Sequence, residues 1–348
     1  MQTIYDFDLK GLEEMLGTLG QKPYRAKQLF MWLYRKRAKT FDEMTDLPAA
    51  LIEELKKRFV IMPLKEIDRQ VAHDGTMKFL FEMQDGSSVE SVLMHFAYGE
   101  SLCVSSQVGC NMACTFCASG LLKKQRSLTA GEMVGEAMFV QELLDEDQRR
   151  LDNIVIMGTG EPFDNYDNVM RFCAIINSDH GLAIGARHIT ISTCGIVPRI
   201  NDFADAHLQY NLAVSLHASN DALRRKLMPI DKAYPMDQLM AALKRYSENN
   251  HRRLTFEYIL LRNVNDQDEN AIELANLIRG MNAYVNLIPY NEVDENGYHS
   301  TDAKTALHFY DVLMKHGVKA TLRTRHGEDI DAACGQLRAR HEKEKADQ

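Results

Sequence analysis

Three cysteines, Cys110, Cys114 and Cys117, stand in a C-x3-C-x2-C pattern with an aromatic residue just before the last of them. A loop that wraps round a soft metal centre brings three such thiolates together, and thiolates select iron–sulfur clusters, zinc or copper(I). A structural zinc site normally closes with four ligands, but the next downstream candidates are Cys173 and His180. The pattern therefore predicts one [4Fe-4S] cluster held by three cysteines, with one iron open to a substrate or cofactor.

This spacing resembles the signature of radical S-adenosylmethionine (SAM) enzymes, in which the methionine part of SAM chelates the open iron. The resemblance implies SAM as a second cofactor. A zinc-binding loop and a chance grouping are the alternatives. Seven cysteines in a chain without a signal peptide fit a reducing cytoplasm, where thiols act as ligands or reagents more often than as structural disulfides.

Length and composition set broad limits on the fold. A chain of 348 residues with 45% hydrophobic content has material for a large core in one or two domains. It contains no run of eighteen apolar residues, and its first residues have neither a basic start nor an apolar stretch. We therefore expect a cytoplasmic protein with no membrane partner.

The net charge of −8 argues weakly against a nucleic-acid partner, but the distribution of charge matters more than its sum. Residues 21–40 carry seven basic and no acidic side chains, interleaved with Tyr24, Phe30, Trp32 and Tyr34. Such a block is either a solvated helix face or an RNA-binding surface on which aromatic rings stack on bases. We favour RNA contact, although Phe30 and Trp32 also suit a core. Further basic groups lie at 123–126, 224–226 and 323–325.

The first 60 residues predict a small helical domain, with apolar residues at helical spacing over 9–19, 25–37 and 49–58. Residues 70–94 then alternate like paired strands around the turn at 84–87, which predicts a hairpin. Glu90 falls inside the second strand. The local sequence assigns no functional role to Glu90, because a carboxylate in an otherwise apolar strand usually faces solvent.

From about residue 100 the pattern changes to short apolar strands that alternate with amphipathic helices. The predicted strands span 102–106, 154–157, 188–192, 212–216, 256–261, 284–289 and 318–322. The predicted helices span 129–144, 169–176, 235–246, 269–278 and 305–315. This alternation predicts a parallel sheet with outer helices. About six such units are too few for an eight-fold barrel, so we expect a partial (β/α)6 barrel of α/β class.

We accordingly expect three parts: an N-terminal helical accessory domain with the hairpin at 1–95, a barrel with a C-terminal segment at 96–340, and a charged tail at 341–348. In barrels of this kind, chemistry is located at the carboxyl ends of the strands.

Polar residues follow several of the predicted strands, where the barrel rule places a site. Gly158-Thr159-Gly160-Glu161-Pro162 ends one strand, and its carboxylate suits the amino group of SAM. Ser192, Ser215-Leu216-His217-Ala218 and Asn291 end three others. Each is weak alone, since His217 could be a core histidine and Asn291 a turn residue.

The thiols outside the cluster motif point to no chemistry by themselves. Cys173 lies in a helical apolar pattern and is expected in the core, and Cys194 has no evident partner. Cys103 would pass as a small buried residue. Cys334 reads as a plain thiol, or at most as a fourth cluster ligand.

Five strings together resemble one family, the radical-SAM adenosine C2 methyltransferases of the RlmN type. They occupy residues 103–110, 158–162, 215–218, 285–289 and 329–337, and the last of them is highly specific. The likeness runs from the basic N-terminus to about residue 340. It implies methylation of adenosine in 23S ribosomal RNA at the peptidyl transferase centre and in transfer RNA 3′ of the anticodon, with an electron donor such as flavodoxin or ferredoxin. Thr159 departs from the family, which often has methionine there.

The resemblance also implies residue roles. Cys334 would take a methyl group from one SAM, and a second SAM would be cleaved reductively to a radical that activates this methyl for addition to adenine C2. Cys103 would release the crosslinked RNA through a transient disulfide with Cys334, and Glu90 would be the general base. The SAM contacts implied are Gly160, Glu161, Ser192, Ser215, Leu216, His217 and Asn291.

Two rival functions stay open. The florfenicol–chloramphenicol resistance methyltransferases share the cluster and the methylated cysteine but modify C8 of the same ribosomal adenosine. Pro162 after Glu161 looks more like the C2 enzymes. The other rival is a non-catalytic RNA protein whose cysteines bind zinc.

Overall fold

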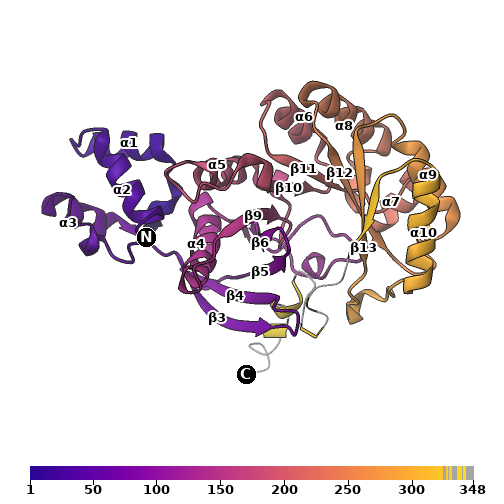
Figure 1. Cartoon of the computed structure of the whole chain (residues 1–348), viewed down its shortest axis with the longest axis horizontal. Coiled ribbons are helices and arrows are strands. Elements are labelled where there is room, and N and C mark those ends of the chain that lie inside the picture. Colours follow the sequence, from indigo (N-terminus) through magenta and orange to yellow (C-terminus); the bar gives the residue numbers. More distant parts are fainter. Residues whose placement is uncertain (324–326, 328, 331–334, 339, 342–348) are drawn as a thin grey trace.

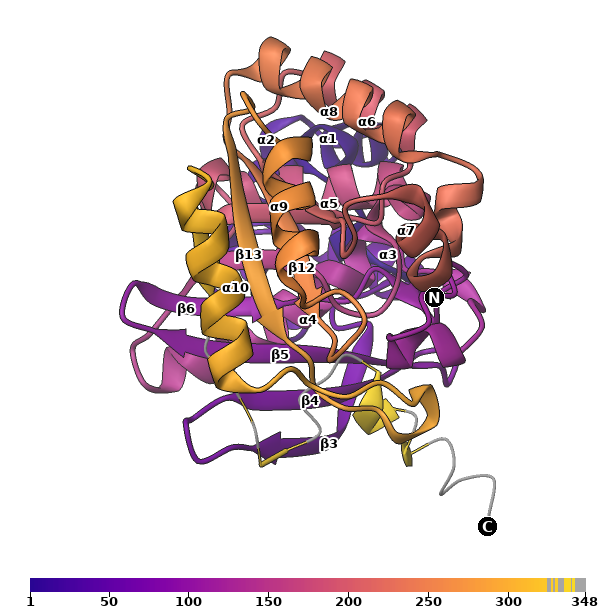
Figure 2. The same cartoon turned by 90° about the vertical axis from the view of Figure 1, so that its right-hand side faces the viewer.

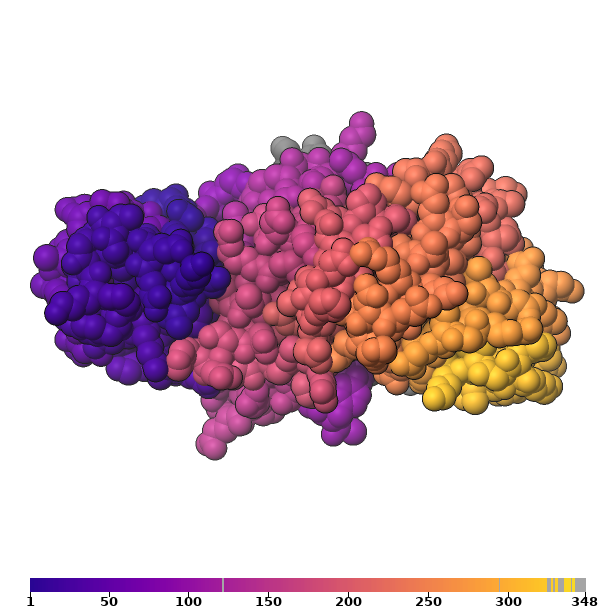
Figure 3. All heavy atoms as spheres, turned by 90° about the horizontal axis from the view of Figure 1, so that it is seen from above, coloured from indigo at the N-terminus to yellow at the C-terminus, as the bar shows by residue number. Residues whose placement is uncertain are grey.

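The structure is a computed structural model that describes residues 1–323, 327, 329–330, 335–338 and 340–341. Three N-terminal helices form a lobe at one end of the molecule (Figures 1 and 3). They are α1 (Leu9–Thr18), α2 (Tyr24–Tyr34) and α3 (Ala49–Arg58), so the helical start of the chain is confirmed. Short strands β1 (Gln2–Thr3) and β2 (Phe59–Val60) pair in parallel and close this lobe.

The N-terminal lobe docks along helix α4 (Ala130–Glu146). At the start of α4, the Asp6 carboxylate accepts a hydrogen bond from the backbone N–H of Gly131 at 2.8 Å, where an acidic group is favoured by the helix dipole. Towards its other end, Arg37 pairs with Asp145. The lobe and the barrel therefore share one packed interface rather than a bare linker.

Within the described residues, ten strands form one sheet in the order β14-β13-β12-β11-β10-β9-β6-β5-β4-β3. The seven parallel strands are β6 (Gly99–Cys103), β9 (Leu151–Ile156), β10 (Ile189–Thr193), β11 (Asn211–Ser215), β12 (Leu254–Leu260), β13 (Ala283–Pro289) and β14 (Ala320–Leu322). The antiparallel strands β3 (Leu64–Val71), β4 (Met77–Met83) and β5 (Ser88–Phe96) extend the sheet beyond β6. The sheet stays open, because β14 and β3 lie at its opposite edges.

Helices cross over between the parallel strands, as such connections require. They are α4, α5 (Tyr166–Asn177), α6 (Val197–Asp205), α7 (Asp221–Leu227), α8 (Met236–Asn250), α9 (Asp268–Leu277) and α10 (Ala303–Lys315). Six strand–helix units result, which confirms the partial (β/α)6 barrel. Figure 2 shows the antiparallel strands crossing below β12 and β13.

Several elements differ from the sequence-based expectation. Helices α6 and α7 were not predicted, and β3 begins six residues before the predicted strand region. Short elements fill the connections: strands β7 (Gln107–Val108) and β8 (Arg126–Ser127), and 3₁₀ turns at Ile4–Asp6, Phe41–Glu43, Ala118–Leu121, Pro162–Asn165, Ala186–His188, Pro229–Lys232 and Asp294–Asn296.

Local sequence explains the entry into α4. The hydroxyl of Thr129 accepts from the N–H of Glu132 at 3.1 Å, and the Glu132 carboxylate accepts from the N–H of Thr129 at 2.9 Å. These two reciprocal hydrogen bonds form a capping box at the start of the helix. Arg126 donates to the same carboxylate and to Asp85 in the β4–β5 turn, so the basic group at 123–126 ties elements together.

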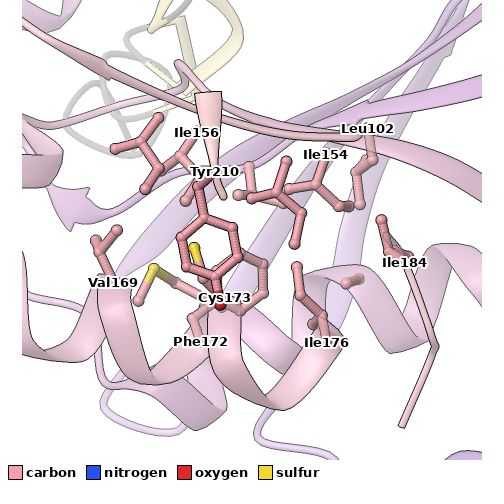
Figure 4. Close-up of a cluster of buried hydrophobic side chains, with 14 of the residues drawn as sticks. Leu102, Ile154, Ile156, Val169, Phe172, Cys173, Ile176, Ile184 and Tyr210 are labelled. Carbon is pink, nitrogen blue, oxygen red and sulfur yellow. The ribbon is translucent and has the colours of Figure 1, made fainter. Parts of the chain in front are cut away.

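The core packs the barrel strands against their helices. Figure 4 shows Cys173 on α5 among Ile156, Val169 and Phe172, all fully buried. Burial raises the pKa of the Cys173 thiol above its usual range. Its expected place in the core is confirmed. No helix within the described ranges is long and apolar enough to cross a membrane.

Candidate active site

A cavity of about 370 Å³ opens at the carboxyl ends of the parallel strands. Its wall includes all three motif cysteines and most of the residues predicted to bind SAM. The predicted residues that line it are Cys103, Cys110, Cys114, Cys117, Gly160, Glu161, Ser192, Ser215, His217 and Asn291. Leu216 is not part of this wall: it is fully buried, and its N–H donates to the Glu257 carbonyl.

Backbone hydrogen bonds fix the cysteine loop against the barrel. The N–H of Cys110 donates to the Leu122 carbonyl, and the N–H of Thr115 donates to the Leu227 carbonyl, each at 2.9 Å. The Tyr290 hydroxyl donates to the Phe116 carbonyl at 3.0 Å. The loop is therefore held at both of its ends and from the far side of the cavity.

The three motif thiols lie together at the cavity wall. Burial raises the pKa of Cys110 to about 12 and the pKa of Cys114 well above its usual range, and the neighbouring Cys117 adds to both shifts. Thiolates crowded in this way need bound positive charge. Among the residues that the structure describes, no three His, Cys, Asp or Glu side chains converge as ligands of one metal ion.

Glu161 is aimed into the cavity by three donors. Its carboxylate accepts from the Thr193 hydroxyl at 2.7 Å, the Cys194 N–H at 2.8 Å and the Phe163 N–H at 2.9 Å. Burial raises the pKa of Glu161, while these hydrogen bonds act in the opposite direction. Gly160 before it has a φ of 114°, and a Cβ there would lie 2.6 Å from Gln107, so the turn requires glycine.

His217 presents a neutral ring to the cavity. Its Nδ1 accepts the N–H of Ile259 at 3.0 Å, which leaves the ring proton on Nε2. Burial lowers the pKa of His217 to about 3. The ring meets Phe116 of the cysteine loop edge to face, with centroids 4.8 Å apart. The histidine is thus both a packed residue and part of the cavity wall.

Sequence reasoning missed two charged residues at the cavity. Glu257 and Arg323 line it, and the Asn286 amide donates to the Glu257 carboxylate at 3.0 and 3.3 Å. Burial raises the pKa of Glu257 to about 7, with Arg323 and Asn286 opposing the shift. A carboxylate inside an apolar strand was the available signal for Glu257. The structure also places Cys194 at the cavity, where its carbonyl accepts from the Arg224 guanidinium at 2.6 Å.

The solvent-facing position expected for Glu90 is wrong. Its side chain is 3% exposed and forms a 3.0 Å ion pair with Lys78, which is fully buried. Glu90 does not line the cavity, although Val92 and Met94 on the same face of β5 do. Cys103 is buried at the cavity wall, as expected of a small residue. Cys334 lies outside the described residues, and no disulfide joins two cysteines within them.

The basic block at 21–40 divides between two roles. Phe30 and Tyr34 are fully buried, so they are core residues and not stacking platforms. Tyr24 is 53% exposed, and Trp32 lies in a surface hollow with Lys27 and Lys36. The Lys36 ammonium sits over the Trp32 ring, 3.4 Å from its centroid.

Three other basic side chains of this block contact the barrel. Arg35 donates to the Asp179 carbonyl, and Arg37 and Lys39 pair with Asp145 and Glu142 on α4. The basic group at 224–226 also differs from a surface charge run, because Arg224 is fully buried beside Asp231.

An open six-unit barrel with three cysteines facing a cavity at its strand ends is the arrangement of a radical SAM enzyme. Comparison with known proteins agrees. The Radical SAM superfamily matches residues 104–275, and the N-terminal domain of ribosomal RNA large subunit methyltransferases matches residues 2–61. The crystal structure of a radical SAM methyltransferase from Sphaerobacter thermophilus is 44% identical and superimposes with a TM-score of 0.93, covering 97% of this chain and 99% of that one.

Two relatives carry the same description, probable dual-specificity RNA methyltransferase RlmN. The one from Enterococcus faecalis is 52% identical and covers 98% of this chain and 97% of its own length. The one from Listeria monocytogenes is 53% identical and covers 97% and 94%. The chain belongs to the RlmN family of radical SAM dual-specificity RNA methyltransferases.

Proposed function

We propose that this enzyme methylates C2 of an adenosine in 23S ribosomal RNA and in transfer RNA, through a methyl group carried by Cys334 and with two molecules of SAM. The observation that carries the proposal is the common cavity of Cys110, Cys114, Cys117 and Cys103 at the strand ends. Adenine C2 is electrophilic, so direct displacement from SAM cannot methylate it. A cavity that combines a cluster site with a redox-capable thiol meets this chemical requirement.

The residues assigned to the cofactors fit them. Cys110, Cys114 and Cys117 would hold one [4Fe-4S] cluster, which supplies the electron that cleaves SAM to a 5′-deoxyadenosyl radical. The Glu161 carboxylate would accept a hydrogen bond from the ammonium group of SAM. The further contacts proposed are Gly160, Ser192, Ser215, Leu216, His217 and Asn291; all but Leu216 line the cavity, and Leu216 would contribute only through its backbone.

Three residues would act on the methyl and the RNA. The Cys334 thiolate would take a methyl group by displacement. Glu90 would accept the proton that leaves adenine C2. The Cys103 thiolate would then attack the Cys334 sulfur, so that the sulfur–carbon bond of the crosslink breaks, the carbon leaves with the RNA and is protonated to the methyl group, and a transient disulfide forms. Cys103 is buried at the cavity wall, which suits a thiol that acts only inside a closed complex.

The RNA would contact the N-terminal lobe through the surface hollow lined by Tyr24, Lys27, Trp32 and Lys36. Aromatic rings beside cations bind single-stranded bases by stacking and charge. A splayed or flipped adenosine is needed, because C2 is otherwise enclosed in the minor groove. We further propose the division into residues 1–95, 96–340 and 341–348, a cytoplasmic location, and a flavodoxin or ferredoxin as electron donor.

Nucleoside mass spectrometry tests this function. RNA is treated anaerobically with reconstituted enzyme, SAM and a reductant, beside a Cys334→Ala control. We expect 2-methyladenosine that is absent from the control. An 8-methyladenosine product would instead assign the chain to C8 chemistry. A colourless, zinc-loaded protein that never cleaves SAM would support the non-catalytic alternative.

A further inference from the structure

The described part of the C-terminal segment, namely Gly327, Asp329–Ile330, Gly335–Arg338 and Arg340, is anchored on the antiparallel strands. At the β3–β4 turn, the N–H of His73 donates to the Asp329 carboxylate at 3.0 Å, and the N–H of Gly327 donates to Asp74 at 3.1 Å. Nearer the barrel, Leu337 is fully buried. The segment is thus attached to β3–β5, and the Gln336 amide also donates to the Glu292 carbonyl after β13 at 3.0 Å.

Glu90 makes the inner anchor of this segment. Its Oε2 accepts the N–H of Gly335 at 2.6 Å, and its Oε1 accepts the N–H of Arg338 at 2.6 Å. Gly335 is the residue that follows Cys334 in the sequence. One carboxylate therefore binds two amides of the stretch next to the proposed methyl carrier.

The other side of Gly335 is equally constrained. Its φ is 91°, and a Cβ there would lie 2.8 Å from both the backbone nitrogen and the hydroxyl of Ser119, two residues after Cys117. Gly335 thus sits between Glu90 on β5 and the turn that follows the cysteine loop. A shift of the Glu90 carboxylate would displace Gly335 from this position.

Lys78 completes the arrangement from the neighbouring strand. Leu80 is the partner of Glu90 in the β4–β5 register and Lys78 is the partner of Val92, so the two charged side chains meet diagonally on one face. The Lys78 ammonium lies 3.0 Å from Glu90 Oε2, and both side chains are buried. A lysine is almost never fully buried unless paired, and removing one partner of a buried pair leaves the other charge uncompensated.

We propose that Lys78 is a positioning residue: it pairs with the buried Glu90 carboxylate and keeps it in place, so that Glu90 holds the amides of Gly335 and Arg338 and fixes the stretch that follows Cys334. This inference rests on the proposed function for its catalytic meaning. The structural part of the inference, which is the coupling of Lys78 to residues 335–338 through Glu90, does not depend on the proposed function.

Other charged groups around Glu90 do not replace Lys78. Arg338 is buried in the segment itself, so it can reach Glu90 only after the segment is placed. Glu136 lies on the opposite face of β5, where its carboxylate accepts from the Ser91 hydroxyl. Cys103 lies on β6, beyond Val92 in the register.

Amide hydrogen exchange of the cluster-reconstituted full chain, read on the peptide that spans 335–338, tests the coupling. The variants are Lys78→Met, Lys78→Arg, Glu90→Gln and the double variant Lys78→Met/Glu90→Gln. We expect Lys78→Met to speed exchange of this peptide by about tenfold to a hundredfold, since it leaves a buried charge unpaired. Lys78→Arg should stay within about threefold of wild type, because it keeps the cation.

Lys65→Met is the matched control. Lys65 also pairs across the sheet, with Glu82 at 2.6 Å, but its side chain is 69% exposed. It should leave the 335–338 peptide unchanged. Equal exchange in Lys78→Met and Lys65→Met would overturn the proposal.

The double variant separates positioning from a general loss of stability. If Lys78 acts through Glu90, Lys78→Met adds little in the Glu90→Gln background. Additive effects would mean that Lys78 supports the hairpin independently, and the proposal would be wrong. The double variant leaves no unpaired buried charge, so this comparison holds even where Lys78→Met does not fold.

Turnover gives a second readout. Lys78→Met should form 5′-deoxyadenosine from SAM at close to the wild-type rate while losing at least tenfold in methylated adenosine, and Lys78→Arg should restore the product. Equal loss of both activities would contradict a positioning role. A wild-type enzyme that makes no methyladenosine would refute the proposed function, whereas the exchange experiment would still decide the coupling.

Discussion

Each half of the sheet contains a buried carboxylate, and the two carboxylates obtain their hydrogen-bond donors from different parts of the chain. Glu161 follows a parallel strand and receives its donors from the adjacent strand end and its own turn. Glu90 lies inside an antiparallel strand and receives its donors from Lys78 and from residues about 245 positions away in the chain. The first site is assembled from neighbouring strand ends, and the second depends on distant tertiary contacts. The parallel half supplies most of the proposed cofactor contacts, and the antiparallel half contacts the segment next to the proposed methyl acceptor.

The largest expected effect falls on the parallel half. Cys114→Ala removes one of three cluster ligands, so cluster content and SAM cleavage should fall by about 10⁴-fold or more, to background. Iron analysis and 5′-deoxyadenosine formation measure this loss. Cys173→Ala is the matched control, because this thiol lies in the apolar core and not at the cavity. Full SAM cleavage by Cys114→Ala would remove the cluster assignment.

A second effect concerns stability at the contact between helix α4 and strand β5. Burial raises the pKa of Glu136 to about 8, although hydrogen bonds from Ser91 and Ser105 oppose the shift. An acid whose folded pKa is raised stabilises the fold fully below its unfolded pKa of about 4.5, and this contribution is lost as pH rises through 8.

Urea unfolding at several pH values tests this contribution. Wild-type stability should fall by up to about 1.4 kcal/mol per pH unit within that window relative to Glu136→Gln, whose amide does not titrate. Parallel pH profiles for the two proteins would show that Glu136 does not carry the proton.

An intermediate effect separates the two roles of the basic block. Lys27→Ala/Lys36→Ala should weaken RNA binding by about tenfold at low salt and lower the salt dependence, because both cations flank the exposed hollow. Arg37→Ala/Lys39→Ala should instead loosen the lobe from α4. Equal RNA affinity for wild type and Lys27→Ala/Lys36→Ala would place the RNA elsewhere.

A smaller effect concerns the cavity carboxylate Glu257. With its pKa raised to about 7 by burial, it is charged above neutral pH and neutral below. SAM is a cation, so its affinity should rise about threefold to tenfold from pH 6 to pH 8 in wild type. In Glu257→Gln the affinity should not change over this range. Equilibrium binding of SAM to the anaerobic enzyme measures the affinity of each protein. If the SAM affinity of Glu257→Gln also changed with pH, the effect would belong to another group.

The smallest effect falls on Thr159. Its hydroxyl is fully buried and makes no hydrogen bond with any described residue, although its N–H donates to Ser105. Thr159→Val should change the free energy of unfolding by less than about 1 kcal/mol and leave SAM cleavage intact, because an unpaired polar group is replaced by an apolar one of similar shape. A large loss of activity would reveal a polar role for this hydroxyl.

The same comparison explains what the sequence could predict. The cysteine loop, Gly160-Glu161 and the strand-end residues are contiguous motifs, and the barrel rule alone brings them together. Helix starts such as Thr129 are also local, because their caps lie within four residues. The strands and helices that carry these motifs were predicted with shifts of a few residues at their ends. Of the residues predicted as cluster ligands or SAM contacts, all but Leu216 line one cavity.

The rest depends on pairings between distant residues. Periodicity does not show that β3–β5 join the barrel sheet or that Lys78 neutralises Glu90 across two strands. Glu90 and Glu257 carried the same available signal, a carboxylate inside an apolar strand, and both proved to be buried and partnered. The roles of single aromatic residues stayed open for a related reason. Phe30 and Trp32 lie on one helix, and only packing separates the core ring from the surface ring.

An isotope chase tests the central claim, that the methyl passes through the C-terminal segment before it reaches RNA. The enzyme is preloaded with SAM that carries a deuterated methyl group, freed of small molecules, and given unlabelled SAM, reductant and RNA for a single turnover. The account predicts that the first 2-methyladenosine carries deuterium from the preloaded protein and that Cys334→Ala gives none. A first product with a fully unlabelled methyl group would show that the methyl bypasses the segment, and would contradict the account.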